Sequence, residues 1–211
     1  MSTNNKEFRG IYLYPVWVRI WHIINALLII TLIITGTSMQ NSGTINHLIQ
    51  FSTAVKIHNL SGIVLSVSYL LFLFGNILSE NGKHYKIQLK GIFTRLKKQA
   101  LYYSAGIFKG QNPPFPVTTE SKFNPLQHFS YVIIMYICVV FVIVSGFGLL
   151  FPETIVDRFM GFSGLFLTDL LHIFVGFIIS IFLLIHVYFC TIGHSPVSNF
   201  KSMINGWHEP H

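Results

Sequence analysis

The chain has 211 residues, of which 52% are hydrophobic, 15% aromatic and only 10% charged. Soluble domains carry about a quarter charged residues, so this composition argues against a soluble protein and indicates that a lipid bilayer is the solvent. The formal net charge of +7 does not indicate nucleic-acid binding, because the basic residues concentrate on one predicted side of the membrane. The two cysteines form no CxxCH or CxxC motif, which excludes covalently attached haem and closely spaced cysteine metal sites.

Four apolar stretches are long enough to cross a hydrocarbon core, which requires about 20 helical residues. Each must be helical, because lipid offers no hydrogen-bond partners to backbone groups. No small-residue cleavage site follows the first stretch, so we predict a retained helix there and not a signal peptide. The expected fold class is all-α, an integral membrane four-helix bundle that forms a single domain over residues 1–211. The predicted transmembrane helices cover residues 16–39, 55–78, 126–150 and 168–192.

The lysines and arginines indicate which side of the membrane each segment faces. The segment 79–122 and both termini are basic, whereas the segment 40–54 has no charge and 151–167 has two acids and one base. We therefore predict that both termini and the basic loop 79–122 face the cytoplasm of a bacterial inner membrane, where they contact anionic lipid. Residues 87–103 are expected to form an interfacial helix. The basic residues of the predicted cytoplasmic side are Lys6, Arg9, Arg19, Lys83, Lys86, Lys90, Arg95, Lys97, Lys98, Lys109, Lys122 and Lys201.

Four of the ten histidines lie inside the predicted spans. An ionisable side chain at membrane depth is costly, so each is a candidate functional residue. A single membrane histidine can also simply bond to a carbonyl or hydroxyl group of a neighbouring helix. The functional interpretation therefore depends on the set and not on any one member. The four histidines are His22, His58, His172 and His186.

The spacing and depth of these histidines form two pairs. His172 and His186 lie 14 residues apart on the fourth span, so they share one face and are separated by ~21 Å along the axis. Counted in residues from the cytoplasmic ends of their spans, His22 and His186 lie at the same depth in the membrane. Counted from the outer ends, His58 and His172 lie at a similar depth. Two imidazoles at one level suit the two axial positions of a haem iron. The sequence thus predicts two b-type haems that transfer single electrons, with both axial positions filled.

Small and basic residues near these histidines fit the same interpretation. Gly36 lies 14 residues after His22 and leaves room at the outer level. Gly62 and Gly176 each follow a candidate ligand by four residues, on the same helix face. Close packing of helices explains such glycines equally well. Arg19 lies one turn before His22 and could pair with haem propionates, or it could be only a topology charge at the membrane edge.

Four segments of the chain carry a family resemblance. They resemble the dihaem cytochrome b subunits of bacterial membrane oxidoreductases, which include the b subunit of nickel–iron hydrogenases, the gamma subunit of formate dehydrogenase and the thiosulfate reductase cytochrome b. The resemblance implies that His22 and His186 bind the cytoplasmic-side haem, and that His58 and His172 bind the periplasmic-side haem. The segments are YPVWVRIWHIINALLIITLIITG, VKIHNLSGIVLSVSYLLFLFGN, KFNPLQHFSYVIIMYICVVFVIVSGFGLLFPE and DLLHIFVGFIISIFLLIHVYFCTIGHSP.

The resemblance also implies a quinone site, for menaquinone or ubiquinone, near the cytoplasmic-side haem. Asn124 matches a residue that contributes to this site in the formate dehydrogenase branch, and Gln127 and His128 follow it closely. Quinone reduction requires hydrogen-bond donors and a protonatable group, because protons arrive with the electrons. The alternative for Asn124 is an ordinary helix cap, since Asn-Pro is common at helix starts. The alternative for His128 is contact with lipid head groups.

The predicted function is electron transfer between a periplasm-facing redox partner and the quinone pool. The partner would be a hydrogenase, dehydrogenase, reductase or multihaem cytochrome c. The alternatives are a haem-free membrane anchor of a respiratory complex, a transporter and a membrane metalloenzyme. Transport is disfavoured because no acidic residue lies deep in any span. The remaining histidines are predicted to be surface residues, namely His47, His84, His194, His208 and His211.

Overall fold

The structure is a computed structural model that describes residues 10–43, 48–193 and 195–208. The chain divides into two compact units, and each is described here by itself. The first, called the long-helix unit, comprises Ile20–Gly82 and Val132–Ile185. The second, called the loop unit, comprises Met1–Arg19, Lys83–Tyr131 and His186–His211, as far as these residues are described.

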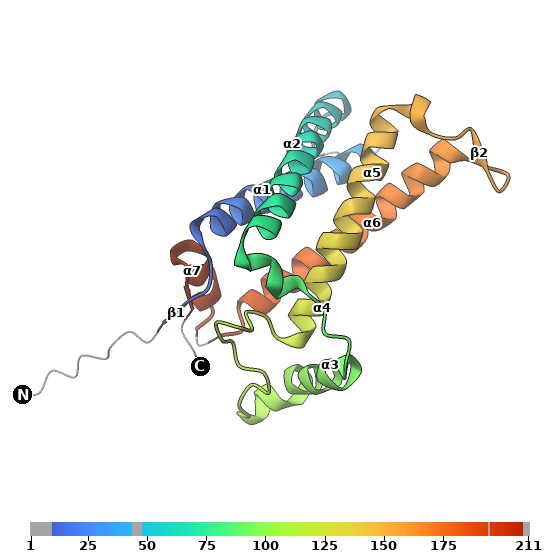
Figure 1. Cartoon of the computed structure of the whole chain (residues 1–211). Coiled ribbons are helices and arrows are strands. Elements are labelled where there is room, and N and C mark those ends of the chain that lie inside the picture. Colours follow the sequence, from blue (N-terminus) through green and yellow to red (C-terminus); the bar gives the residue numbers. More distant parts are fainter. Residues whose placement is uncertain (1–9, 44–47, 194, 209–211) are drawn as a thin grey trace, which may run out of the picture. The chain divides into compact units, whose positions relative to one another are not determined.

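The four predicted spans are confirmed as four helices that are long and apolar enough to cross a membrane. The third consists of α4, a π-helical turn and α5 in direct succession (Figure 1). The second begins at Phe51, earlier than predicted, because the amides of Thr53 and Ala54 bond to the carbonyl of Gln50 and extend the first turn. The long elements are α1 (Val16–Gln40), α2 (Phe51–Leu78), α4 (Pro125–Ile133), the π turn (Ile134–Cys138), α5 (Val139–Leu150) and α6 (Gly164–Cys190).

Apolar side chains cover the outside of the long helices, as expected for helices that face lipid. Leu27 on α1 is 62% exposed, Leu71 on α2 is 64% exposed and Leu184 on α6 is 73% exposed. Water would disfavour so much exposed apolar surface. The protein therefore has the surface of an integral membrane protein.

A small buried core joins α1 to α2 in the long-helix unit. The Trp21 ring stacks on Phe72 with centroids 4.2 Å apart, and Phe72 is completely buried. The indole N–H of Trp21 donates to the Ser68 carbonyl at 3.0 Å, and the Asn25 amide donates to the Ser68 hydroxyl at 3.0 Å. Small and polar side chains hold membrane helices together in this way, because lipid supplies little hydrophobic force between helices.

The loop unit contains shorter elements. The helix predicted at 87–103 is present but begins later, at Ile92, because Gly91 takes a left-handed conformation with φ 68°. The all-α prediction missed two short antiparallel strand pairs, one in each unit. The elements of the loop unit are β1 (Ile11–Tyr12), α3 (Ile92–Leu101), a π turn (Tyr102–Gly106), a 3-10 turn (Ile107–Lys109), α7 (Ser198–Asn205) and β4 (Trp207–His208). β1 pairs with β4, and in the long-helix unit β2 (Arg158–Phe159) pairs with β3 (Phe162–Ser163).

Candidate functional site

Two of the predicted ligands lie next to each other in the long-helix unit. His58 comes from α2 and His172 from α6, and their ring centroids lie 6.1 Å apart with an interplanar angle of 70°. The structure thus brings together the two histidines that the sequence places at one depth. We call this arrangement the outer pair.

Each ring of the outer pair hydrogen-bonds through Nδ1 to a hydroxyl group. The Oγ1 of Thr35 on α1 lies 2.9 Å from Nδ1 of His58, and the Oγ of Ser145 on α5 lies 3.0 Å from Nδ1 of His172. Each ring also hydrogen-bonds to a backbone carbonyl of the helix that carries the hydroxyl residue. For His58 this is the carbonyl of Leu32 on α1, and for His172 that of Val142 on α5.

These contacts define which nitrogen carries the proton. The hydroxyl of Thr35 donates its own proton to the Thr31 carbonyl at 2.7 Å, and that of Ser145 donates to the Phe141 carbonyl at 2.6 Å. Each hydroxyl therefore accepts at its other side, and a carbonyl can only accept. This network favours the tautomer in which Nδ1 of each ring is the donor, which leaves Nε2 with a lone pair. A neutral imidazole held by Nδ1–H in this way is the form that binds a metal ion.

The spacing of the outer pair fits an iron between the rings. An imidazole nitrogen binds a metal ion at about 2.0–2.1 Å, and the ring centre lies about 1.1 Å further away, so two opposed ligands have ring centres about 6.3 Å apart. The observed separation of 6.1 Å agrees with this distance. No group of three or more His, Cys, Asp or Glu that could hold a metal ion occurs within the described residues. A pair of neutral histidines would hold a haem iron through its two axial positions.

Two glycines let the rings of the outer pair lie close to neighbouring backbone. A Cβ on Gly36 would lie 3.4 Å from Cε1 of His58, and a Cβ on Gly146 would lie only 3.1 Å from Cε1 of His172. Gly36, which the sequence marks as leaving room for a haem, thus packs against a ligand ring. Gly62 and Gly176 are different, because no described atom outside their own helix backbone lies within 4 Å of a Cβ built on them.

His22 and His186 belong to different units, so their pairing stays a prediction. In the loop unit, Nδ1 of His186 lies 3.3 Å from the Tyr131 hydroxyl, and Nε2 lies 3.7 Å from Sγ of Cys190. His22 lies on α1 and is partly buried. Of the predicted second pair, His186 thus has a tyrosine hydroxyl and a cysteine thiol as its neighbours.

Arg19 has a backbone partner in the loop unit. Its guanidinium donates a hydrogen bond to the carbonyl of Ile204 in the last turn of α7. Basic side chains stabilise helix C-termini in this way, since the last carbonyls have no partner within the helix. The structure thus gives Arg19 a role in attaching α7, beyond the two roles that the sequence indicates.

Asn124 and Gln127 form a reciprocal cap at the start of α4. The Asn124 Oδ1 accepts from the amides of Leu126 at 3.1 Å and Gln127 at 3.0 Å, and the Gln127 Oε1 accepts from the Asn124 amide at 3.3 Å. The Asn124 Nδ2 donates to the Tyr103 hydroxyl at 2.8 Å. This is a capping box with Asn in the first position. Both ends of the Asn124 amide are engaged, so the structure supports the helix-cap alternative for this residue.

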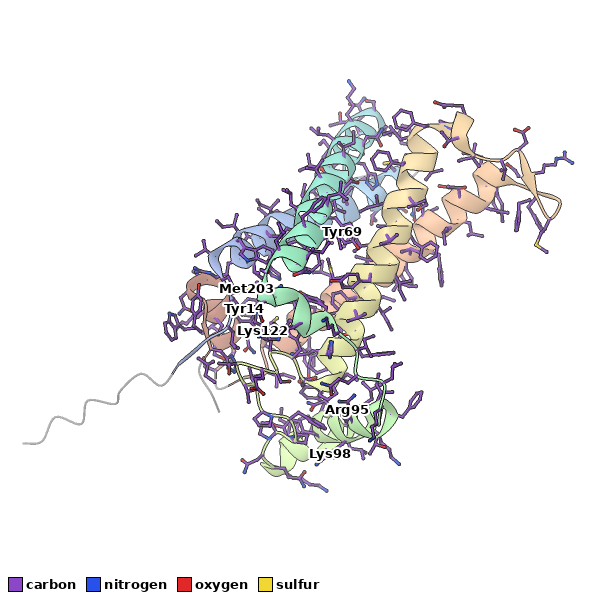
Figure 2. All side chains as sticks on the ribbon, in the orientation of Figure 1. Tyr14, Tyr69, Arg95, Lys98, Lys122 and Met203 are labelled. Atoms are coloured by element: carbon purple, nitrogen blue, oxygen red, sulfur yellow. The ribbon has the colours of Figure 1, made fainter. Side chains whose placement is uncertain are left out.

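His128 lines a cavity of about 230 Å³ in the loop unit. Its Nε2 is buried and has no hydrogen-bond partner among the described residues. Lys122 is 7% exposed, and its amino group lies 5.6 Å from the centre of the Tyr14 ring. Figure 2 labels both side chains. The cavity is lined by Lys83, His84, Lys86, Ile87, Gln88, Ile92, Arg95, Phe115, Glu120, Ser121, Lys122, Phe123, Pro125, His128 and Phe129.

The basic groups at this cavity have lowered pKa values. Burial, together with the nearby charge of Lys83, lowers the pKa of Lys122 to about 8. Burial first, and then the charges of Lys122 and Lys83, lower the pKa of His84 to about 4. Near neutral pH His84 is uncharged, whereas Lys122 is mostly protonated, with a minor fraction that has lost its proton. A group that titrates close to neutral pH is suited to proton exchange.

Aromatic contacts connect His186 to this cavity within the loop unit. The Tyr131 ring lies 5.7 Å from the His186 ring, and Phe123 lies 5.0 Å from Tyr131. Phe123 is also part of the cavity lining. The candidate ligand and the candidate quinone-contacting histidine therefore border one continuous group of side chains.

Two of the histidines predicted at the surface are buried. His84 and His208 are each 9% exposed. His208 is covered because β4 pairs with β1, and His84 because it lies against the cavity. The prediction was wrong for these two residues. His47, His194 and His211 lie outside the described residues.

The sequence did not indicate the partners of the candidate ligands. Thr35, Ser145, Gly146 and Tyr131 touch the histidines but were not singled out. The available signal was a hydroxyl residue followed directly by glycine. It occurs at 35–36 in the first span and at 145–146 in the third, but also at 61–62 in the second, so it does not by itself identify the partners.

Comparison with known proteins identifies relatives of the chain. The family model for prokaryotic cytochrome b561 matches residues 13–206. A protein of Escherichia coli (strain K12) named "Putative cytochrome YdhU" is 39% identical over 203 residues, which cover 94% of this chain and 74% of that relative. No solved structure matches the chain.

Proposed function

The chain belongs to the prokaryotic cytochrome b561 family of membrane electron-transfer proteins, and on this basis we propose that it is a dihaem cytochrome b whose outer haem is held by His58 and His172. The observation that carries this proposal is the opposed outer pair, with centroids 6.1 Å apart and both Nδ1 atoms hydrogen-bonded. The Nε2 atom of each ring then has a lone pair that would bind the haem iron.

The second haem is assigned to His22 and His186. Their equal depth along α1 and α6 supports this assignment, together with the 14-residue spacing of His172 and His186 on one continuous helix. Each haem supplies a one-electron carrier, and the protein contributes the ligands, the burial and the hydrogen bonds that set its potential. Two carriers about 21 Å apart along the α6 axis would connect the two sides of the membrane.

Quinone exchange is proposed at the cavity of the loop unit. His128 offers a ring nitrogen that is buried without a hydrogen-bond partner among the described residues, and the cavity is also lined by Lys122 and Phe123. A quinone carbonyl needs a donor, and the quinol must lose protons, so these groups suit the reaction. Asn124 and Gln127 act here by holding the start of α4, and thereby the position of His128 one residue further on.

The proposed partner is a periplasm-facing redox subunit at the outer haem. A hydrogenase, dehydrogenase, reductase or multihaem cytochrome c has the required chemistry, because each exchanges single electrons with a haem. The apolar groove of about 540 Å³ formed by α5, α6 and the segment between them lies beside Ser145. This groove includes Phe141, Phe147, Phe151 and Leu171.

The test is a dithionite-reduced minus oxidised visible spectrum of the purified protein, with haem quantified as the pyridine haemochrome. Low-spin b-type bands and two haems per chain are the expected result. A well-folded protein that binds no haem when produced with adequate haem supply would overturn the proposal and leave the membrane-anchor function in its place.

A further inference from the structure

Both rings of the outer pair lie against the same two-residue pattern, a hydroxyl residue followed by glycine. On α1 a hydroxyl residue and the next glycine, Thr35 and Gly36, contact the ring of His58. On α5 Ser145 and Gly146 contact the ring of His172 in the same way. In each case the hydroxyl lies at Nδ1 and the glycine lies at Cε1. We call each hydroxyl–glycine pair a seat.

Hydroxyl residues elsewhere in the long helices, such as Thr31 on α1 and Ser180 on α6, are not seen with this contact. Thr31 donates to the Leu27 carbonyl at 2.9 Å, and Ser180 donates to the Gly176 carbonyl at 2.8 Å. Such bonds to the carbonyl four residues earlier are the usual state of Ser and Thr in membrane helices. Thr35 and Ser145 make that bond and in addition accept from a histidine. The imidazole contact is therefore an added feature and not a by-product of helix geometry.

We propose that Thr35 and Ser145 are positioning residues that fix the planes of His58 and His172 and thereby set the reduction equilibrium of the outer haem. The inference rests on the proposed ligation of that haem by the same two histidines. The hydroxyl fixes one side of each ring, and the glycine allows the backbone to contact the adjacent edge. The 70° angle between the ring planes follows from the two seats acting on two different helices.

The direction of the effect follows from hydrogen bonding. An acceptor at Nδ1–H makes the imidazole a stronger electron donor through Nε2, which favours ferric over ferrous iron. Loss of the hydroxyl leaves only the Leu32 or Val142 carbonyl as acceptor. The ring keeps its tautomer but loses one of its two hydrogen-bond acceptors, so it donates less electron density through Nε2. The ferrous form of the haem is then stabilised relative to the ferric form.

The variants are Thr35→Val, which nearly keeps the side-chain volume, and Ser145→Ala. Thr35→Ser restores a hydroxyl and serves as the rescue variant. Thr31→Val and Ser180→Ala are matched controls, because each removes a hydroxyl that bonds only to its own helix. The measurements are haem content, a redox titration that resolves the two haems, and electron paramagnetic resonance of the oxidised protein, which reports the angle between axial imidazole planes.

We expect Thr35→Val and Ser145→Ala to keep two haems and to shift the reduction equilibrium of one haem about threefold to tenfold toward the ferrous form. A tenfold shift corresponds to about 59 mV for one electron. The resonance of that haem alone should change, and Thr35→Ser and both controls should match the parent protein. Loss of one haem in Thr35→Val with retention in Thr35→Ser supports the inference equally.

An unchanged potential and resonance in both Thr35→Val and Ser145→Ala would overturn the inference, as would a Thr35→Ser protein that behaves like Thr35→Val. These outcomes differ from failure of the proposed function. In that case the parent protein itself would bind no haem, and the question of potential would not arise.

Discussion

The surroundings of the outer pair differ from those of His186, although the proposed chemistry is the same at both levels. In the long-helix unit, aliphatic hydroxyls hydrogen-bond to the rings of His58 and His172 at 2.9 and 3.0 Å. The same hydroxyls donate hydrogen bonds to backbone carbonyls of their own helices. In the loop unit, the partner of His186 is the phenol of Tyr131 at a longer 3.3 Å. The hydrogen bonds at the outer pair are thus shorter.

Protonatable groups also separate the two regions. Thr35, Ser145, Gly36 and Gly146 lie at the rings of the outer pair, and none of them exchanges protons near neutral pH. The one carboxylate that acts on His172 through its charge is Asp169, among the described residues. His186 is connected through Tyr131 and Phe123 to a cavity lined by His128, His84 and Lys122. For the proposed haems, this difference predicts that proton exchange is concentrated at the cavity near His186 and not at the outer pair.

The largest effect should come from removing a ligand. His172→Ala should lower the haem content from two per chain to about one, because a low-spin haem held by two histidines is bound weakly by one. His58→Ala should remove the same haem, whereas His186→Ala and His22→Ala should both remove the other. Pyridine haemochrome quantitation and electron paramagnetic resonance together distinguish the two haems. If His58→Ala and His172→Ala removed different haems, the assignment of the outer pair would be wrong.

The second-largest effect should come from His128, the protonatable residue at the cavity of the loop unit. His128→Gln should slow reduction of the haems by a water-soluble quinol about 100-fold, because a positioned acid–base group contributes at least about this much. The haem content should stay at that of the parent protein. Stopped-flow absorbance of the haem bands measures the rate. Lys97→Ala is the matched control, since Lys97 is exposed on α3 and does not line the cavity. Reduction of the His128→Gln protein at the parental rate would remove this residue from the quinone site.

A third, smaller effect separates the two seats. Gly146→Ala places a Cβ 3.1 Å from the ring of His172, whereas Gly36→Ala places one at 3.4 Å from the ring of His58, an ordinary van der Waals distance. We expect Gly146→Ala to retain several-fold less of the outer haem after dilution, because a displaced ligand binds iron less tightly. Gly36→Ala should differ little from the parent protein. Equal haem retention in the two variants would mean that the backbone at Gly146 relaxes freely.

Sequence reasoning identified the spans and the candidate ligands because both leave local signals. A transmembrane helix needs a long apolar run, and a histidine inside such a run is conspicuous. The partner hydroxyls leave only a weak signal, a following glycine, which Thr35 and Ser145 share with Ser61. The packing of α1 against α2 is needed to place Thr35 at His58.

Non-local contacts also explain the failed predictions. His84 and His208 lie in polar segments, which are normally at the surface, but a cavity and a strand pair bury them. For Arg19 the two roles predicted from the sequence, a propionate partner or a topology charge, stay predictions. Its bond to α7 could not be predicted, because α7 could not be placed against it from sequence. Asn124 was the most balanced case, since Asn-Pro-x-Gln fits both a quinone contact and a cap. The structure shows the cap through three hydrogen bonds.

The smallest effect is a pH dependence that originates in the loop unit. The pKa of His84 is about 4 in the folded protein and 6.5 without the protein environment, because burial and nearby lysines disfavour the charged ring. Between these values the unfolded chain binds more protons than the folded one, so stability falls as pH is lowered from about 6.5 to about 4. One proton contributes at most about 1.4 kcal/mol per pH unit.

His84→Gln should therefore reduce the loss of thermal stability between pH 7 and pH 5 without changing the stability at pH 8. Thermal unfolding in detergent, followed by helix circular dichroism and separately by the haem bands, measures this effect. The outer pair lies in the other unit, so its haem signal should keep the parental pH dependence if the two units respond independently. If the His84→Gln protein lost stability in acid as strongly as the parent, other groups would have to be the origin of the dependence, and the cavity would not be the acid-sensitive part of the loop unit.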